Sequence, residues 1–355
     1  MSSADVMEKL GTPGARLTDY RGGQTVARYS DPRKEFSALE NSCGLYGLGW
    51  RTSIRLAGRD RVRWLNGMVT NNVRDLTVSR GVYAFVLNPQ GHILGDLYAY
   101  NRGDSFLIAT DRAQAEKILG LFRRYIIMDQ VEVTNISEKL TALGVAGPAS
   151  RDTLGRVGLD LPELEPLQLA EVSWQQLGLT VLRADNPISE SYEIFLSSES
   201  VNLLGETLVK AGAIPVGSEA LELFRIAAGI PCYGVDIRER DLPQETEQAR
   251  ALNFTKGCYI GQEIVERIRS RGNVHRKFTG FVLQGSLPAP ATKVQADGKD
   301  IGEITSVACL PMPGGDLPVA LGYVRREIGT SGQQVQIGDL KATVRDLPFA
   351  EVLKK

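Results

Sequence analysis

The sequence predicts an α+β protein of more than one domain whose C-terminal part is a small β-barrel or β-sandwich. The chain has 355 residues, which is more than one compact core usually supports. Within the first 277 residues, β-rich runs followed by apolar residues at helical spacing occur twice, which predicts two α+β lobes. Beyond Lys277, short β-rich runs alternate with Gly, Pro and Asp, as in small all-β domains.

The first lobe is expected to contain a hairpin, a third strand and a helix. Strands are predicted at Val82–Leu87, Ile93–Tyr100 and Phe106–Ala109. Asn88–Gly91 has Pro and Gly where a type I turn favours them. Apolar residues from Ala115 to Phe122 then recur at helical spacing, and Thr110 or Asp111 is available as a cap.

The second lobe repeats this order of elements. Strands are predicted at Ala142–Val145, Leu179–Arg183 and Tyr192–Leu196, followed by a helix that carries Val201, Leu204 and Leu208. A further helix is expected over Ser218–Gly229, with Ser218 as its cap and Gly229 as its stop.

The barrel domain is expected to begin near Arg276–Phe278. Its predicted strands are Phe278–Leu283, Ile301–Val307, Val319–Val324, Gln333–Ile337 and Ala342–Arg345. We therefore divide the chain into a module at 1–277, made of lobes at roughly 1–138 and 139–277, and a barrel domain at 278–355.

Composition excludes several classes of protein. Hydrophobic residues make up 43% and charged residues 23%, which is the usage of folded globular proteins and not of disordered or fibrous ones. Lys plus Arg number 41 against 42 for Asp plus Glu, so we expect no general attraction to nucleic acid or to membranes. No signal-like or membrane-spanning stretch is present, which predicts a cytoplasmic protein.

The cysteines and histidines predict neither a disulfide framework nor a metal site. Cys43, Cys232, Cys258 and Cys309 form no CxxC pair, so reduced thiols are expected. The only two histidines, His92 and His275, are too few for a His-based metal centre.

The segment Lys256–Glu263, KGCYIGQE, is the first candidate for chemistry. Ile260, Ile264 and Ile268 follow at helical spacing, so a helix is expected to begin near Gly261. Cys258 would then lie beside the helix N-terminus and near Lys256, and both would favour its thiolate. The alternative is a small buried hydrophobe, which is the commoner role of a single cysteine.

A basic strip and three further charged residues are the other candidates. The strip comprises Arg267, Arg269, Arg271, Arg276 and Lys277, and either holds a small anion or forms a solvated surface. Asp96 and Glu193 lie in β-rich runs, where a carboxylate can accept two neighbouring N–H groups of a ligand. Arg225 follows Phe224 on the capped helix, where it could brace a ligand or a carboxylate.

These segments resemble known families. KGCYIGQE is similar to the signature of the YgfZ family, and the string LFRIAAGIPCYG at Leu223–Gly234 resembles the glycine-cleavage T-protein pattern. The strings at Ile301–Ser306, Ala320–Val324 and Pro348–Phe349 are similar to the barrel domain of both families. The resemblance runs from about Asp60 to the end of the chain.

The resemblance implies a three-lobed, ring-like fold that binds tetrahydrofolate, or a one-carbon derivative of it, in a central channel. Glu193 matches the Glu that grips the pterin, Arg225 the Arg that supports the site, and Asp96 the acid near the folate nitrogens. The implied catalytic residues are Cys258, Lys256 and Asp96, and the implied folate contacts are Asp96, Glu193, Arg225, Tyr233, Gln262 and Glu263. We expect Cys258 and the two acids to open onto one shared cavity.

The cysteine motif favours the YgfZ function, which implies a folate-dependent role in iron-sulfur cluster assembly or repair, with iron-sulfur enzymes that modify tRNA as clients. T-proteins usually carry two consecutive acids where this chain has Gly95-Asp96. The alternatives are a folate-dependent aminomethyltransferase or demethylase of the T-protein type, and a folate-binding module without turnover.

Overall fold

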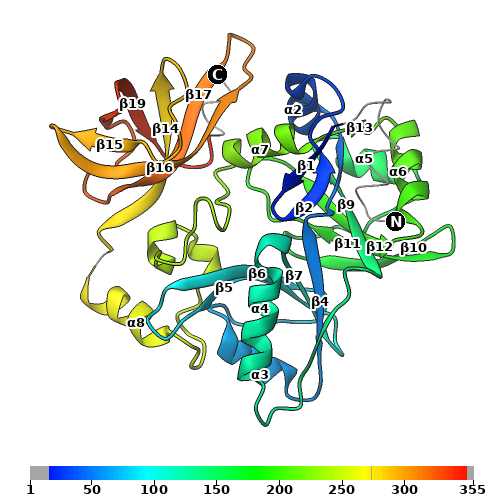
Figure 1. Cartoon of the computed structure of the whole chain (residues 1–355). Helices are drawn as coiled ribbons and strands as arrows, with labels where there is room; N and C mark the ends of the chain where they lie inside the picture. Colours follow the sequence, from blue (N-terminus) through cyan, green and yellow to red (C-terminus); the bar gives the residue numbers. More distant parts are fainter. Residues whose placement is uncertain (1–15, 273, 350–355) are drawn as a thin grey trace. The chain divides into compact units, whose positions relative to one another are not determined.

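The computed structural model describes residues 16–272 and 274–349, which divide into two compact units (Figure 1). Unit 1 comprises the residues up to Ala84 together with Asp96–Leu221. Unit 2 comprises Phe85–Gly95 and the residues from Glu222 onward. Within these described ranges, we find no helix with the length and apolar character needed to cross a membrane.

Unit 1 contains a six-stranded sheet covered by helices. The strand order is β10 (Leu169–Trp174), β11 (Leu177–Arg183), β12 (Ser191–Ser197), β9 (Leu140–Ala146), β3 (Gly44–Gly47) and β13 (Ile214–Pro215). The helices are α2 (Pro32–Asn41), α5 (Ser150–Arg156) and α6 (Val201–Lys210). Val201, Leu204 and Leu208 recur on one side of α6, so they enter the same buried cluster as Tyr192 and Ile194 of β12.

A five-stranded sheet has the order β5 (Gly81–Leu87), β6 (Ile93–Asn101), β7 (Phe106–Asp111), β4 (Arg51–Ala57) and β8 (Glu132–Asn135). The remaining elements of unit 1 are α3 (Arg61–Met68), α4 (Arg112–Tyr125) and the hairpin of β1 (Leu17–Tyr20) and β2 (Gly23–Val26). Along β6, Leu97 and Ala99 are buried, whereas Asp96 and Tyr98 are half-buried on the other face. This alternation places two polar side chains side by side.

Unit 2 contains a closed barrel in the order β14 (Arg276–Gln284), β17 (Leu317–Arg325), β16 (Lys299–Leu310), β15 (Lys293–Ala296), β18 (Gln334–Ile337) and β19 (Leu340–Arg345). Before it come most of α7 (Ser218–Ala227), the short helices η1 (Pro243–Thr246) and η2 (Ala249–Ala251), and α8 (Gln262–Arg271). Phe281, Ile304 and Val344 fill the barrel interior with other apolar side chains. Closure leaves no free sheet edge in the barrel.

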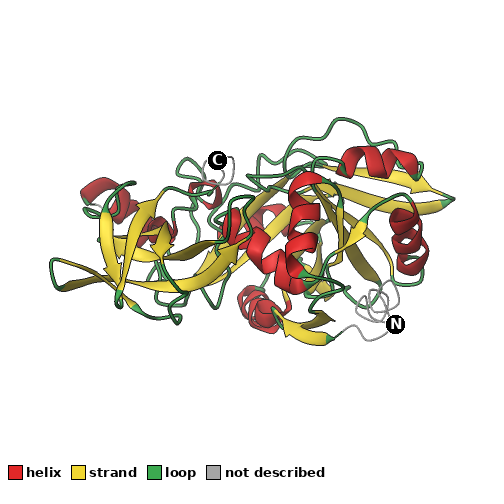
Figure 2. Cartoon of the chain, turned by 90° about the horizontal axis from the view of Figure 1, so that it is seen from above, coloured by secondary structure: helices red, strands yellow, loops and turns green. Residues whose placement is uncertain are grey.

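The predicted fold class, α+β with a C-terminal β-barrel, is confirmed (Figure 2). Each strand named from the sequence corresponds to an observed strand. The expected cap of α4 is wrong, because Asp111 makes no capping hydrogen bond and instead accepts one from Arg21 Nη1 at 3.2 Å. The Thr110 hydroxyl donates to the backbone carbonyl of Asp96 at 2.8 Å. Both side chains therefore serve tertiary contacts.

Candidate functional site

Asp96 is held from two sides within unit 1. The Tyr83 hydroxyl donates to Oδ2 at 2.6 Å, and the side-chain amide of Gln114 donates to Oδ1. Gln114 lies in the first turn of α4 and also accepts the Asp96 backbone N–H at 3.0 Å. The carboxyl group is therefore fixed in orientation by a strand on one side and a helix on the other.

The surroundings of Asp96 shift its acidity. Burial raises the pKa of the Asp96 carboxyl, and the negative charge of Asp111 raises it further. The hydrogen bonds from Tyr83 and Gln114 and the charge of Arg21 oppose this and lower the pKa. Because burial prevails, Asp96 takes up a proton more readily than an ordinary aspartate does. Such a group is suited to exchanging a proton with a bound substrate.

Glu193 has one carboxylate oxygen paired and one without a partner. It lies on β12 between Tyr192 and Ile194, which enter the core on the opposite face, yet Glu193 itself is only 8% exposed. Arg51 Nη2 donates to Oε1 at 3.2 Å. Oε2 is buried and has no hydrogen-bond partner. A buried carboxylate oxygen without a partner is costly, so this atom indicates where a donor from a ligand would be accepted.

A glycine shapes the sheet surface beside Glu193. Glu193 faces Gly144 on the neighbouring strand β9, and Gly144 in turn faces Tyr46 on β3. A Cβ atom on Gly144 would lie 2.1 Å from the Tyr46 ring, so only glycine allows the ring to rest against the strand. Burial raises the pKa of Tyr46, and the Glu193 charge raises it further, so the phenol stays neutral.

The two acids belong to one group of contacts. The Arg51 guanidinium carbon lies 5.5 Å from the centre of the Tyr98 ring, and the Tyr98 and Tyr83 ring centres are 5.0 Å apart. Tyr83 completes the connection through its hydrogen bond to Asp96. We call Asp96, Tyr83, Tyr98, Arg51 and Glu193 the unit 1 polar cluster. The structure thus brings together Asp96 and Glu193, which were singled out in separate strands.

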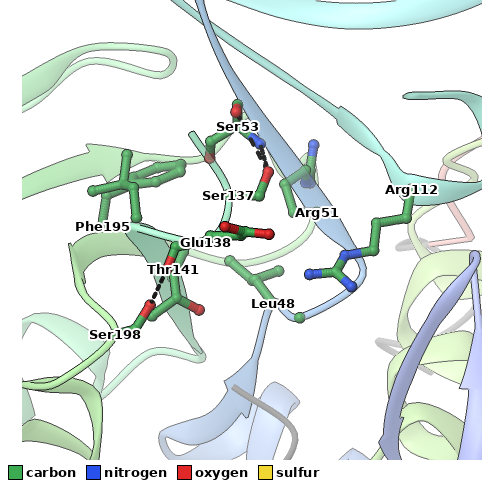
Figure 3. A pocket seen from close by; sticks show the side chains of 12 residues that line it. Leu48, Arg51, Ser53, Arg112, Ser137, Glu138, Thr141, Phe195 and Ser198 are labelled. Atoms are coloured by element: carbon green, nitrogen blue, oxygen red, sulfur yellow. Dashed lines mark hydrogen bonds between the residues drawn. The ribbon is translucent and has the colours of Figure 1, made fainter. Parts of the chain in front are cut away.

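A cavity of about 280 Å³ adjoins this cluster (Figure 3). Arg51 lines it together with Ser53 on the same strand, Arg112 at the start of α4 and Glu138 in the turn before β9. Leu48 and Phe195 supply apolar walls. Arg51 therefore lies between the cavity and Glu193.

Arg225, in unit 2, is fully paired with protein groups. Its Nε and Nη2 donate to the Glu222 carboxylate, and its Nη1 donates to the Ile230 carbonyl and to Asp236 Oδ2, both at 2.6 Å. Nη2 also donates to Ser306 Oγ at 2.9 Å. Arg225 is 5% exposed. Every nitrogen of the guanidinium donates to a protein oxygen. The predicted contact of Arg225 with folate stays a prediction.

Asp236 is the centre of this second group. It is completely buried and accepts hydrogen bonds from Arg225, from the Cys232 backbone at 2.9 Å, and from the hydroxyls of Thr305 and Ser306. Thr305 and Ser306 belong to β16 of the barrel. We call Arg225, Glu222, Asp236, Thr305 and Ser306 the unit 2 polar cluster. It ties the barrel to the segment that precedes it.

The cysteine motif forms a turn before α8. The helix begins at Gln262, and Gly261 precedes it with φ +82°, so the predicted helix start is confirmed. A Cβ atom on Gly261 would lie 2.5 Å from the Asn88 carbonyl, which explains the glycine. Cys258 is exposed, and the Lys256 ammonium lies 4.9 Å from the centre of the Tyr259 ring. Catalytic roles for Cys258 and Lys256 stay predictions.

The other predicted folate contacts in unit 2 have protein partners. Tyr233 donates its hydroxyl to the Leu94 carbonyl at 2.7 Å, and Gln262 Oε1 accepts the Tyr259 backbone N–H at 3.3 Å. Glu263 is exposed and pairs with Arg267 at 2.6 Å. Because these residues belong to unit 2 and the two acids to unit 1, the expected shared cavity stays a prediction.

Three arginines of the basic strip pair with acids. Arg267 pairs with Glu263 and Arg269 with Glu266 along α8, at 2.6 and 3.4 Å. Arg276 pairs with Asp241 at 2.6 Å and with Glu245 at 2.9 Å. The sequence suggested an unpaired strip because Asp241 and Glu245 are distant in the chain.

Sequence reasoning missed Arg51, Tyr83, Gln114 and Asp236. Tyr98 was also missed, although the sequence could have indicated it. It lies two residues after Asp96 on a predicted strand and must share its face. The others gave no such signal. Arg51 contacts Glu193, and Asp236 contacts Thr305 and Ser306, which are far away in the chain.

Comparison with known proteins gives consistent results. A family model described as the GCVT N-terminal domain matches residues 6–256. The aminomethyltransferase of Rubrobacter xylanophilus is 29% identical and covers 95% of this chain and 90% of its own length. That of Halothermothrix orenii is 28% identical, with coverage of 91% and 92%. The glycine cleavage system aminomethyltransferase T from Bartonella henselae has a TM-score of 0.86 at 22% identity, covering 97% and 96% of the two chains.

The expected YgfZ function in iron-sulfur cluster assembly or repair is wrong. The relatives that match over 91% to 95% of the chain are aminomethyltransferases. The prediction gave too much weight to eight residues, whose two glycines and helix start define a local backbone geometry and not a reaction. The predicted iron-sulfur clients and effects on tRNA-modifying enzymes are withdrawn with it. The broader resemblance, to the T-protein superfamily, is confirmed.

Proposed function

Because the chain belongs to the family described by the GCVT N-terminal domain, which matches residues 6–256, we propose that it is a folate-dependent aminomethyltransferase. Tetrahydrofolate, the cofactor expected from the sequence, is the one that aminomethyltransferases of this family use. The name shared by the curated relatives supports the reaction. Aminomethyl transfer, expected above as an alternative to the YgfZ function, is therefore the proposed function.

The unpartnered oxygen of Glu193 carries the proposal. A pterin presents neighbouring N–H groups, and a carboxylate accepts such a pair best when both of its oxygens take part. Arg51 fixes Oε1, and the buried Oε2 has free acceptor capacity. The residues of this chain therefore fit a folate, with Glu193 as the group that would hold the pterin.

Asp96 is the residue that we assign to the chemical step. When bound, the reduced folate supplies the amine that takes up the one-carbon unit. Asp96 would accept or return a proton as this amine reacts, and its carboxylate would stabilise positive charge that develops on the donor carbon. Tyr83 and Gln114 keep the carboxyl group in one orientation, which removes the need to order it during the reaction.

The activity test uses the full chain, tetrahydrofolate and an aminomethyl donor. We expect ammonia release that requires both compounds and yields an equivalent amount of one-carbon folate. Folate binding is measured separately through the fluorescence of Trp50, whose ring stacks on Tyr46 with centres 6.5 Å apart. Absence of any folate-dependent product would refute the proposed reaction.

The binding arm compares Glu193→Gln with Glu132→Gln. The first change replaces one acceptor oxygen at the proposed pterin contact, and loss of a hydrogen bond to a charged group weakens binding by about ten- to a hundredfold. Glu132 is exposed on β8, so its change serves as the matched control and should leave folate affinity unaltered. Equal folate affinity in both variants would remove Glu193 from the proposed site.

A further inference from the structure

The cavity beside the unit 1 polar cluster has a charge pattern that the proposed function does not use. Figure 3 shows the side chains of Arg51, Arg112 and Glu138 around the same space. They come from β4, from the first residue of α4 and from the turn before β9. Two cations and one anion thus converge on the cavity from separate parts of unit 1.

The charged groups at the cavity have unused bonding capacity. Arg112 and Glu138 are exposed, and within the part of the chain that the structure describes their side chains have no hydrogen-bond or ion-pair partner in the protein. Arg51 Nε is buried and also lacks an acceptor, although Nη2 of the same guanidinium is bonded to Glu193. A buried donor without an acceptor is costly, and an anionic group of a ligand would satisfy it.

The remaining walls limit the size of a ligand. The Ser53 backbone N–H already donates to Ser137 Oγ at 2.9 Å, so that wall is internally satisfied. Leu48 and Phe195 give the cavity apolar surface. A volume of about 280 Å³ lies below the usual range for drug-sized ligands, which runs from about 300 to 1,000 Å³. The cavity therefore suits a compact molecule.

We propose that this cavity binds a small zwitterion of the amino-acid class. Its carboxylate accepts hydrogen bonds from Arg112 and from Arg51 Nε, and its ammonium group donates to Glu138. Leu48 and Phe195 contact its carbon atoms. The proposal does not rest on the proposed function, because it needs neither folate binding nor turnover.

A folate tail is a less suitable occupant than a free amino acid. The terminal glutamate of a folate has carboxylates, but its nitrogen is an amide and carries no positive charge. The amide would leave Glu138 without a cationic partner, whereas an ammonium group neutralises it. Glu138 is therefore the residue that distinguishes the two sources of a carboxylate.

The test measures binding of glycine, alanine and serine to the full chain in the absence of folate, by calorimetry or ligand-detected NMR. Glycinamide, which lacks the carboxylate, and N-acetylglycine, which lacks the ammonium group, are the matched probes. Glycinamide loses the charge that Arg112 and Arg51 contact, and N-acetylglycine loses the charge that Glu138 contacts, so we expect each to bind at least about tenfold more weakly than glycine. No saturable binding of any amino acid up to millimolar concentrations would overturn the proposal.

Two substitutions test the assignment of the charges. Arg112→Gln should weaken glycine about tenfold and leave glycinamide unchanged, because only the carboxylate contact is lost. Glu138→Gln should weaken glycine binding, and the variant should no longer bind glycine more tightly than N-acetylglycine. Arg123→Gln, which changes an exposed arginine on the same helix, is the matched control and should bind glycine as the parent chain does.

Two further results would overturn the proposal. One is binding of the amino acids that is indifferent to both cavity substitutions, since the ligand would then lie elsewhere. The other is that tetrahydrofolate displaces bound glycine, both from the parent chain and from the Glu193→Gln variant. The cavity would then receive the folate tail. If the parent chain bound glycine but showed no aminomethyl transfer, the proposed function would be refuted and the amino-acid site would stand.

Discussion

The two polar clusters contain similar residues but differ in how completely they are satisfied. In the unit 2 polar cluster, all three nitrogens of Arg225 donate to protein oxygens, and the buried Asp236 accepts four hydrogen bonds. In the unit 1 polar cluster, Arg51 Nε and Glu193 Oε2 are buried without partners. Both clusters pair an arginine with a carboxylate, but only one has atoms left for a ligand.

This difference separates a structural role from a functional one. A buried ion pair whose hydrogen bonds are all made contributes to one specific fold, and removing one partner leaves a buried charge. A cluster with unused donors and acceptors costs stability, and such sites are retained where a ligand completes them. We therefore expect substitutions in unit 1 to affect binding and catalysis, and substitutions in unit 2 to affect stability.

The largest effect is expected for Asp96→Asn. Asparagine keeps the shape of the side chain but cannot exchange a proton, so kcat should fall by about a hundred- to ten-thousandfold. The free energy of unfolding at neutral pH should change by less than about 1.5 kcal/mol, because a lost hydrogen bond is offset by removal of a buried charge. Steady-state turnover and urea unfolding measure the two quantities.

The pH dependence of stability gives an internal check on this variant. The pKa of Asp96 is raised in the folded state, so the folded chain binds more protons than the unfolded chain between the ordinary and the raised pKa. This contribution to stability is lost as pH rises through that window. In Asp96→Asn, the free energy of unfolding should no longer show this decrease as the pH rises. A variant that unfolds readily at neutral pH, or that keeps full turnover, would contradict the functional assignment of Asp96.

A large effect of the opposite kind is expected for Asp236→Ala. The change removes the fully buried one of the two carboxylates that pair with Arg225, and it leaves the Ser306 hydroxyl and the Cys232 backbone N–H without their acceptor. The free energy of unfolding should fall by about 3–5 kcal/mol. Asp339→Ala, in an exposed turn of the barrel, is the control and should be neutral. If Asp236→Ala were as stable as the parent chain, the contrast between the clusters would fail.

The sequence predicted elements better than contacts. Strand β6 was found because a β-rich run follows a turn that contains Pro and Gly, and α6 because Val201, Leu204 and Leu208 recur on one face. The sequence also singled out Asp96 and Glu193. It could not find Arg51, because nothing near it in the chain shows that β4 brings it to Glu193. The reactive environment of Cys258 was inferred from neighbours in sequence and stays a prediction; the Lys256 ammonium lies over the Tyr259 ring.

The smallest effect is expected for Tyr83→Phe, which tests how the unit 1 polar cluster controls its acid. The Tyr83 hydrogen bond lowers the pKa of Asp96 against the effects of burial and Asp111, so its removal should raise that pKa further. If the carboxylate is the active form, the acid limb of kcat/KM moves to higher pH while the plateau changes only a few-fold. Tyr100→Phe, whose hydroxyl makes no hydrogen bond to Asp96 in the described part of the chain, should leave the limb in place. An alkaline limb that moves to higher pH, in place of the acid limb, would mean that the protonated acid is the active form, and would reverse the role assigned to Asp96.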